Sequence, residues 1–461
     1  MARADFRPLR HARLCLAAAL LAQAPALAQV GNFINFESPQ VHPIDITPDG
    51  STLLAVNTAD GQLEVFDLVS GLPVRRGSVQ VGVDPVSVRA RSNGEAWVVN
   101  QISDSVSVVD LASMRVVRTV LVGDEPADIV FTAKPARAFV TLAMSSRVVS
   151  FDPNAAAPAL TSTAILGASP RALATSPDGT KVYAAVFESG NKTTVVPRAT
   201  VNLANSPYAG VNPPPNNGNT FDPPRAAGQP QPPRVAHLVR KNAAGQWMDD
   251  NGRNWSSFIT WDVVDNDIAV IDAASLSTSY VTGLMTTVAS IGVAPNGQIL
   301  AVGLEARNEI RFEPKLDGVF AKVMGATVPA GGVGTPAVFD LNPHLTYASS
   351  SIPELERTQS VGDPRGVAWT PDSAMAFTAA MGTNCLIAVS PAGARLAKIP
   401  VGEGPSGVVC APNGQFVYAL NRFEGSVSAV RVSSLAEEGR ATFHDATPAS
   451  VKTGRKWLYN T

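Results

Sequence analysis

A unit of about 40 residues recurs along the 461-residue chain, and this repeat limits the folds that the chain can adopt. Val-Gly or Leu-Gly pairs end successive units at Gly82, Gly123 and Gly167, and later at Gly362 and Gly402, with adjacent spacings of 41, 44 and 40 residues. Each unit holds an apolar strand, a turn such as PDG, SNG or PNG, and further short strands. One four-stranded sheet cannot bury both faces alone, whereas copies packed in a ring can. The repeat therefore predicts a β-propeller.

The number of recognisable first strands predicts an all-β, seven-bladed propeller of four-stranded antiparallel blades over residues 29–440. Residues 331–362 have the length of a reduced unit but lack a PDG-type turn, so eight blades are the alternative. We expect the ring to close by pairing a strand from one terminus with the blade at the other. The seven segments that carry the first two strands are residues 42–57, 84–100, 125–142, 169–186, 288–304, 363–380 and 404–421.

The gap between Gly167 and Gly362 is 195 residues, which exceeds three periods of 41 by 72 and predicts an insertion at 192–262 within blade four. Its Pro-rich part, 205–233, cannot form a helix or a central strand and is expected to be an extended loop. Trp247, Trp255 and Trp261 follow this loop. We expect a local cluster that anchors the loop against the propeller, with ligand stacking as the alternative.

The first 28 residues have the pattern of a secretory signal peptide. A basic leader precedes a stretch of 9 apolar residues at 14–22, and Ala26-Leu27-Ala28 forms a small-x-small cleavage site. That stretch is too short to span a bilayer, and no later apolar run reaches 18 residues. The sequence thus predicts a periplasmic or extracellular protein without a transmembrane segment. The leader arginines are Arg3, Arg7, Arg10 and Arg13.

Composition argues against several functions. The 36 basic and 38 acidic side chains give a net charge of -2 without a basic stripe, which argues against nucleic-acid binding. A phosphate loop, a dinucleotide fingerprint, a G-x-S-x-G elbow and a Ser-His-carboxylate grouping are all absent from the sequence. The mature chain would keep two cysteines, Cys385 and Cys410, which could form one disulfide or be two small buried residues.

Three segments carry a family resemblance: AWVVN at 96–100, VYAAV at 182–186 and VYALN at 417–421. With the SVSVVD-like strands that follow in successive units, they resemble the WD40-like YVTN-type propeller repeats of exported or surface proteins of bacteria and archaea. The resemblance covers about 41–435, apart from the insertion. It implies the propeller fold and leaves the activity open.

The tail at 441–461 resembles the linker that joins some exported YVTN-type propellers to a C-terminal c-type cytochrome domain. The segment GRNWSSFITWDVVDNDIAVID at 252–272 is similar to a motif of the same subset. The chain contains no C-x-x-C-H motif, so it is not expected to carry covalent haem itself. Three alternatives follow: the sequence is a truncated form of a longer haem protein, a c-type cytochrome partner lies on another chain, or the electron-transfer role of this subset does not apply.

Candidate ligand-binding residues emerge when the units are aligned on the proline that opens the first strand. The flanking positions hold acidic groups and two arginines, which should gather at one mouth of the central channel. Arg171 and Arg365 open blades four and six, so their guanidinium groups could hold an anionic group between them. The alternative is that the acids pair with neighbouring arginines or cap turns. The candidates are His42, Asp84, Glu125, Arg171, Asp363 and Arg365.

A metal site is left undetermined by the sequence. No two histidines of the mature chain lie at ligand spacing, although His42 beside Asp84 and Glu125 could form a mixed nitrogen and oxygen site. Asp249 and Asn251 belong to a DDNG segment that fits either a fragment of a calcium loop or an ordinary turn.

These observations favour an exported, non-enzymatic propeller that acts as a binding or scaffolding module, with a protein partner or a small anionic ligand at the channel mouth. The alternative is a propeller enzyme, a lactonase-like hydrolase or a quinone-dependent dehydrogenase, with its site at the same mouth.

Overall fold

A computed structural model describes residues 36–210, 236–249, 251–307, 321–347 and 352–459. The predicted signal peptide and most of the Pro-rich loop lie outside these residues. Strands dominate the described chain and form eight antiparallel sheets, seven of four strands and one of three. Most sheets follow chain order, as expected for consecutive short strands joined by tight turns.

The first two sheets contain β1 (Ile44–Ile46), β2 (Thr52–Asn57), β3 (Gln62–Val69) and β4 (Leu72–Gln80), then β5 (Pro85–Ala90), β6 (Glu95–Asn100), β7 (Ser105–Asp110) and β8 (Arg115–Leu121). The third contains β9 (Pro126–Ala133), β10 (Ala136–Leu142), β11 (Arg147–Phe151) and β12 (Thr161–Ala164). The fourth contains β13 (Ala168–Thr175), β14 (Lys181–Glu188), β18 (Ile268–Asp272) and β19 (Thr278–Val281). The fifth contains β20 (Thr287–Val293), β21 (Ile299–Ala306), β22 (Ala321–Val328) and β23 (Ala337–Asp340). The sixth contains β24 (Pro364–Trp369), β25 (Ala376–Ala380), β26 (Cys385–Val389) and β27 (Arg395–Pro400). The seventh contains β28 (Pro405–Cys410), β29 (Phe416–Asn421), β30 (Ser426–Arg431) and β31 (Ala436–Thr442).

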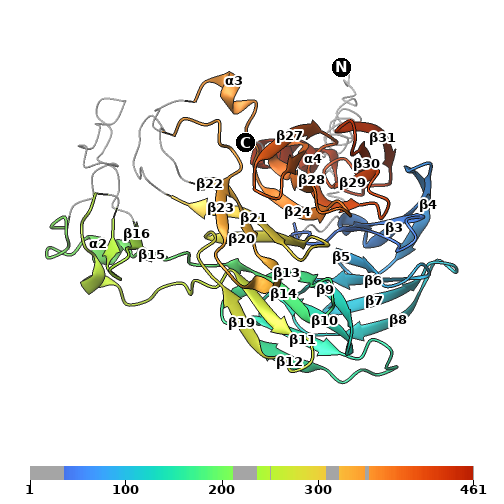
Figure 1. Cartoon of the computed structure of the whole chain (residues 1–461), viewed down its shortest axis with the longest axis horizontal. Helices are drawn as coiled ribbons and strands as arrows, with labels where there is room; N and C mark the ends of the chain where they lie inside the picture. Colours follow the sequence, from blue (N-terminus) through green and yellow to red (C-terminus); the bar gives the residue numbers. More distant parts are fainter. Residues whose placement is uncertain (1–35, 211–235, 250, 308–320, 348–351, 460–461) are drawn as a thin grey trace, which may run out of the picture.

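The first strands of the four-stranded sheets contact one another in a closed cycle. Strand β1 contacts β5, β5 contacts β9, β9 contacts β13 and β13 contacts β20. Strand β20 then contacts β24, β24 contacts β28, and β28 contacts β1, which closes the cycle. Figure 1 shows these sheets radiating around a common centre, from blue through green to red. This arrangement is that of an all-β propeller, as the repeat predicts.

Buried side chains lie between neighbouring sheets. Val130 and Phe139 of the third sheet, for example, share one cluster with Leu173 and Val182 of the fourth. Each sheet thus covers a face of the next, which explains why a single unit would leave its apolar faces in water.

The recurrent asparagine and glycine of the repeat contact each other at one end of the sheets. Asn100 and Asn421 end the second strands, are buried, and donate to serine hydroxyls at the start of the third. A Cβ on Gly82 would lie 2.6 Å from Asn100, and one on Gly402 would lie 2.4 Å from Asn421. The recurrent glycine therefore leaves the space that the asparagine side chain occupies.

Ring closure differs from our expectation. The sheet β1–β4 comes from the N-terminal part alone and β28–β31 from the C-terminal part alone, so strand exchange between the termini is absent from the described sheets. The two sheets are joined by packing and by side-chain hydrogen bonds, such as Tyr418 Oη to Gly71 O at 2.9 Å and Asn57 Nδ2 to His444 O at 2.7 Å. Each end sheet already has four strands, which removes the need for a borrowed one.

The chain between β14 and β18 leaves the ring and forms a separate small unit, called the insertion below (residues 189–264). It contains β15 (Thr193–Val196), β16 (His237–Lys241) and β17 (Trp247–Met248) as a three-stranded sheet, with α2 (Arg198–Val201) and the 3-10 turn η3 (Ser256–Phe258). Figure 1 shows α2, β15 and β16 beside the ring. Trp247 and Trp255 belong to the insertion's own core, with Val196, Val201 and Val239, rather than to a cluster shared with the ring.

The remaining short elements are η1 (Thr58–Asp60), η4 (Ala330–Gly332), α3 (Glu354–Arg357) and η5 (Met381–Thr383). The stretch 331–362, which has the length of a reduced unit, contains β23, the fourth strand of the fifth four-stranded sheet.

The C-terminal tail, which resembles a linker in sequence, forms helix α4 (Ala449–Tyr459) and packs on the ring. Arg455 of α4 is 5% exposed and contacts Glu37, while the ring of Tyr459 lies 5.1 Å from that of Phe423.

Candidate functional site

The residue before the first-strand proline adopts the same unusual backbone conformation in five sheets. Asp84, Glu125, Ser169, Asp363 and Gly404 have φ between 47° and 65°. In four of them, Ser169 excepted, the carbonyl accepts a hydrogen bond from the N–H that follows the second strand. This left-handed conformation is costly for residues other than glycine, so its recurrence marks an architectural turn at this mouth of the ring.

Arg171 and Arg365 are held in place in the same way. Arg171 Nε donates to Ser169 Oγ at 3.0 Å, and Arg365 Nε donates to Asp363 Oδ1 at 2.7 Å, in each case two residues back. The guanidinium of Arg171 also lies 3.9 Å from the ring centroid of Phe187. Within the described part of the chain, the terminal Nη atoms of both arginines have no hydrogen-bond partner, and both residues are partly exposed.

The two arginines lie within electrostatic range of each other. Burial lowers the pKa of Arg171, and the charge of Arg365 lowers it further, while Glu188 and Glu125 act in the opposite direction. An arginine remains charged at neutral pH despite such a shift. Arg365 is paired with Asp363, whereas Arg171 has no ion-pair partner among the described residues, so an added anion would be favoured beside Arg171.

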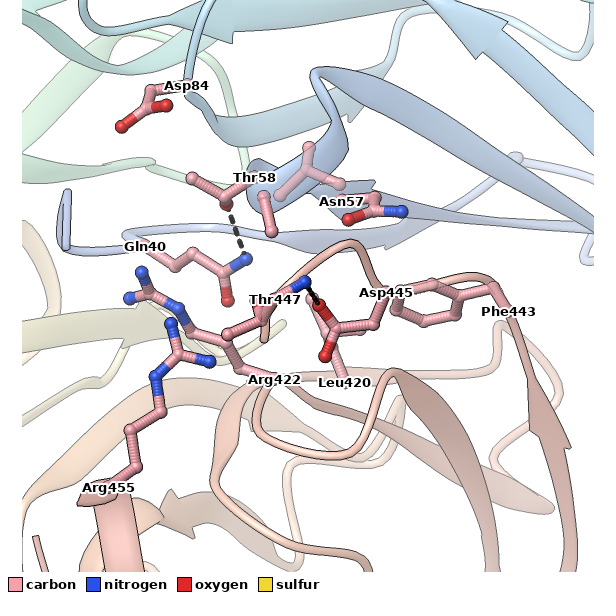
Figure 2. A pocket seen from close by; sticks show the side chains of 12 residues that line it. Gln40, Asn57, Thr58, Asp84, Leu420, Arg422, Phe443, Asp445, Thr447 and Arg455 are labelled. Atoms are coloured by element: carbon pink, nitrogen blue, oxygen red, sulfur yellow. Dashed lines mark hydrogen bonds between the residues drawn. The ribbon is translucent and has the colours of Figure 1, made fainter. Parts of the chain in front are cut away.

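Asp84 lines a small pocket of about 20 Å³ (Figure 2). Its Oδ2 accepts a hydrogen bond from Ser38 Oγ at 2.6 Å. Burial raises the pKa of Asp84, against the hydrogen bond from Ser38 and the charge of Arg422, which lower it. A pocket of this volume has room for about one water molecule, so it is not itself a site for an organic ligand.

Two further arginines, Arg422 and Arg455, line this pocket and point toward each other in Figure 2. Glu37 joins them: its Oε1 accepts from Arg455 Nε and Nη2 at 3.0 and 2.8 Å, and its Oε2 lies 3.4 Å from Arg422 Nη2. Burial lowers the pKa of Arg422, Glu37 raises it, and Arg455 and Arg365 lower it. The mouth thus already holds one carboxylate between paired arginines.

Sequence reasoning missed Arg422 and Phe187, although the signal was present. Arg422 directly follows β29, at the place that Thr58, Gln101 and Met381 take in other units, and Phe187 is the next-to-last residue of β14. Alignment on the end of the second strand, rather than on the first-strand proline alone, would have placed them at the mouth.

The other predicted residues have local partners. His42 Nε2 lies 4.0 Å from Asp45 Oδ1 within its own unit, and Glu125 Oε2 accepts from Gln101 Nε2 at 3.3 Å. Asp363 forms the ion pair with Arg365. In the described ranges, no group of three or more His, Cys, Asp or Glu side chains could hold a metal ion, so His42, Asp84 and Glu125 do not come together as a mixed site.

Cys385 and Cys410 are free thiols, which corrects the disulfide alternative. Cys385 pairs with Ala380 at the start of a third strand, whereas Cys410 ends the first strand of the next sheet, so they lie at opposite ends of the sheets. Burial raises the pKa of both thiols, and that of Cys410 reaches about 12.

Asp249 forms a turn rather than a calcium loop. Its Oδ1 accepts from the backbone N–H groups of Asn251 and Arg253, and its Oδ2 accepts from Trp255 Nε1 at 2.9 Å and Tyr208 Oη at 2.8 Å. Both oxygens are therefore already engaged by protein donors.

None of the helices in the described part of the chain has the length and apolar character needed to cross a membrane. No family model and no curated protein matches the sequence. The fold and mouth define the chain as a β-propeller protein, and solved structures agree with this class.

A structure titled hydrazine synthase, from Kuenenia stuttgartiensis, aligns with a TM-score of 0.58 at 18% identity, covering 88% of this chain and 99% of that one. U3-55K aligns with a TM-score of 0.52 at 11% identity, covering 84% and 90%. At these identities the likeness concerns the fold alone.

Proposed function

We propose that this chain is a seven-bladed propeller that serves as a binding module and holds an anionic group at the channel mouth. The closed cycle of seven first strands supports the blade count, with the three-stranded sheet of the insertion standing outside the ring. The observation that carries the binding proposal is the Arg171 guanidinium group, which Ser169 and Phe187 hold in place, whose Nη atoms have no hydrogen-bond partner among the described residues, and which lies within electrostatic range of Arg365.

A guanidinium group that is already held in one orientation suits two oxygens of a carboxylate or phosphate group. Because Nε is already used and the ring of Phe187 supports one face, little side-chain freedom is lost when an anion binds. The nearby Glu37 carboxylate, held by Arg455 and Arg422, shows the same chemistry within the chain itself.

We also retain three proposals from the sequence: export through the leader, membership of the YVTN-type propellers, and a c-type cytochrome as partner. The leader and the repeat motifs support the first two. The resemblance of residues 252–272 and of the tail supports the third, and exposed Trp457 and Leu458 on α4 offer an apolar surface for a protein contact.

The test is calorimetric titration of acetate, phosphate and citrate into the purified chain and its variants. We expect saturable binding of at least one anion, weakened about tenfold or more in Arg171→Ala and in Arg365→Ala. Arg76→Ala is the matched control, because Arg76 lies on the outer strand β4 and pairs with Asp67. Absence of binding for all three anions, or an equal loss in the control, would overturn the proposal.

A further inference from the structure

A groove of about 280 Å³ lies between α4 and the turns of the sixth and seventh four-stranded sheets, and it shares Arg455 with the small pocket described above. Helix α4 contributes Arg455, Lys456 and Tyr459, and the turns contribute Met381, Glu403 and Phe423. The groove exists because α4 packs on the ring through Arg455 and Glu37. Its volume approaches the lower end of the range typical of small-molecule sites.

One wall of the groove is aromatic. The rings of Phe423 and Tyr459 lie 5.1 Å apart with an angle of 36° between their planes. Phe423 is buried, and Met381 beside it is 5% exposed, so both side chains are fixed by packing. A planar ring placed on this wall would gain aromatic and thioether contacts that an aliphatic ring of equal size would not.

The other wall is cationic. The Arg455 guanidinium lies 5.4 Å from the centroid of the Phe423 ring while its Nε and Nη2 hold Glu37. Lys456 Nζ lies 2.8 Å from Glu403 Oε1, and these two side chains are 60% and 41% exposed. An ion pair so exposed is weak, so a ligand carboxylate can replace Glu403 as the partner of Lys456.

We propose that this groove binds a small aromatic carboxylate. The ring packs on Phe423 and Tyr459, and the carboxylate binds Lys456 beside the edge of Arg455. Glu403 then acts as an internal competitor for the same ammonium group. Arg171 and Arg365 do not line this groove, so ligand binding here does not depend on anion binding at the mouth.

The experiment titrates benzoate into the full chain carrying Arg171→Ala, so that the mouth site does not contribute. Cyclohexanecarboxylate, with the same charge but no aromatic ring, and benzamide, with the ring but no charge, are the matched probes. We expect saturable benzoate binding that is about fivefold tighter than that of either matched probe. Equal affinity for benzoate and cyclohexanecarboxylate, or no saturable binding, would overturn the proposal.

Variants in the same background separate binding from folding. Glu403→Gln removes the competitor and should tighten benzoate binding about threefold, a gain that a merely damaged fold would not give. Phe423→Leu should weaken benzoate binding about tenfold. Trp457→Ala is the control, because Trp457 is on α4, is 84% exposed and does not line the groove. Unchanged affinity in Glu403→Gln, or a loss in Trp457→Ala equal to that in Phe423→Leu, would refute the assignment.

Discussion

Asp267 in the ring and Asp249 in the insertion are both buried, yet their surroundings move their pKa values in opposite directions. Burial raises the pKa of Asp267 to about 7, although the N–H groups of Leu284 and Met285 donate to it. Burial also acts on Asp249, but hydrogen bonds from His237, Trp255, Arg253 and Tyr208 outweigh it and lower the pKa to about 2.

The contrast reflects two ways of stabilising a fold. In the ring, apolar clusters between sheets continue from one repeat to the next. A single buried carboxyl therefore destabilises the ring only where it lies. Among its described residues, the insertion has a buried core cluster of five apolar side chains, so we expect its polar centre around Asp249 to contribute to its stability. The insertion therefore depends on a few specific contacts, whereas the ring depends on many similar ones.

The largest expected effect is on the insertion core. Trp255→Ala removes a fully buried indole and one donor to Asp249, at a cost of about 3–5 kcal/mol. We expect the insertion to unfold locally while the ring stays folded, because all the described residues of its core cluster belong to the insertion itself. Hydrogen exchange followed by mass spectrometry should show β15–β17 losing protection while β2 and β29 retain theirs.

Trp261→Ala provides the control for this substitution, since Trp261 is 49% exposed and its loss should change little. If the thermal midpoint of the ring fell by the same amount as insertion protection, the two regions would be one cooperative unit and the comparison would fail.

A second prediction concerns pH and sharpens the comparison. The folded pKa of Asp267 lies above its unfolded value of 3.8, so the folded state loses stability as pH rises from about 4 to 7. Asp267→Asn should therefore stabilise the ring at pH 8, by on the order of 2 kcal/mol, and have little effect near pH 4.

Asp249 should behave in the opposite sense. Its folded pKa is depressed from 3.8 to about 2, so its contribution is present above pH 4 and is lost as pH falls toward 2. Asp249→Asn should weaken insertion protection at pH 7 by on the order of 2 kcal/mol and less at pH 3. Unfolding curves and hydrogen exchange at the stated pH values test both; the same sign for both variants at neutral pH would contradict the assignment.

The ring could be predicted from the sequence because residues at the same position of successive repeats make the same contacts. The turn aspartates Asp49, Asp178 and Asp372 each accept from the backbone N–H two residues on, so a PDG-type signal has one structural meaning wherever it occurs. The buried Asn100 and Asn421 contact the recurrent glycine in the same way in two units. Repetition thus supplies several independent signals for one geometry.

The candidate site was predictable only in part. The alignment on proline found Arg171 and Arg365, because both sit at the same repeat position, but Arg455 belongs to a tail that has no counterpart in the repeat. Its packing depends on Glu37, 418 residues earlier in the chain, and such a pairing has no local sequence signal. The insertion core could not be predicted for the same reason, because His237 and Asp249 come into contact only when the three-stranded sheet has formed.

The smallest expected effect lies at the join between the two regions. Glu305 on β21 is 9% exposed at its side chain, and its oxygens accept from Arg240 Nη1 of the insertion at 2.5 Å and from Asn191 Nδ2 at 2.7 Å. Thr286 donates to the same carboxylate from the ring, through its N–H and its hydroxyl at 3.0 and 2.9 Å. Glu305→Gln keeps the shape but removes the charge, and should cost about 1 kcal/mol.

This loss should loosen the attachment without unfolding either region, because the ring clusters and the insertion core are both untouched. Protection of β15 and β16 should fall slightly while the ring's thermal midpoint stays within about 2 °C. A double-mutant cycle with Arg240→Ala isolates the pair: the two substitutions together should cost less than their sum, since each removes the same contact. Strict additivity would mean that the pair of Arg240 and Glu305 does not help to hold the insertion to the ring.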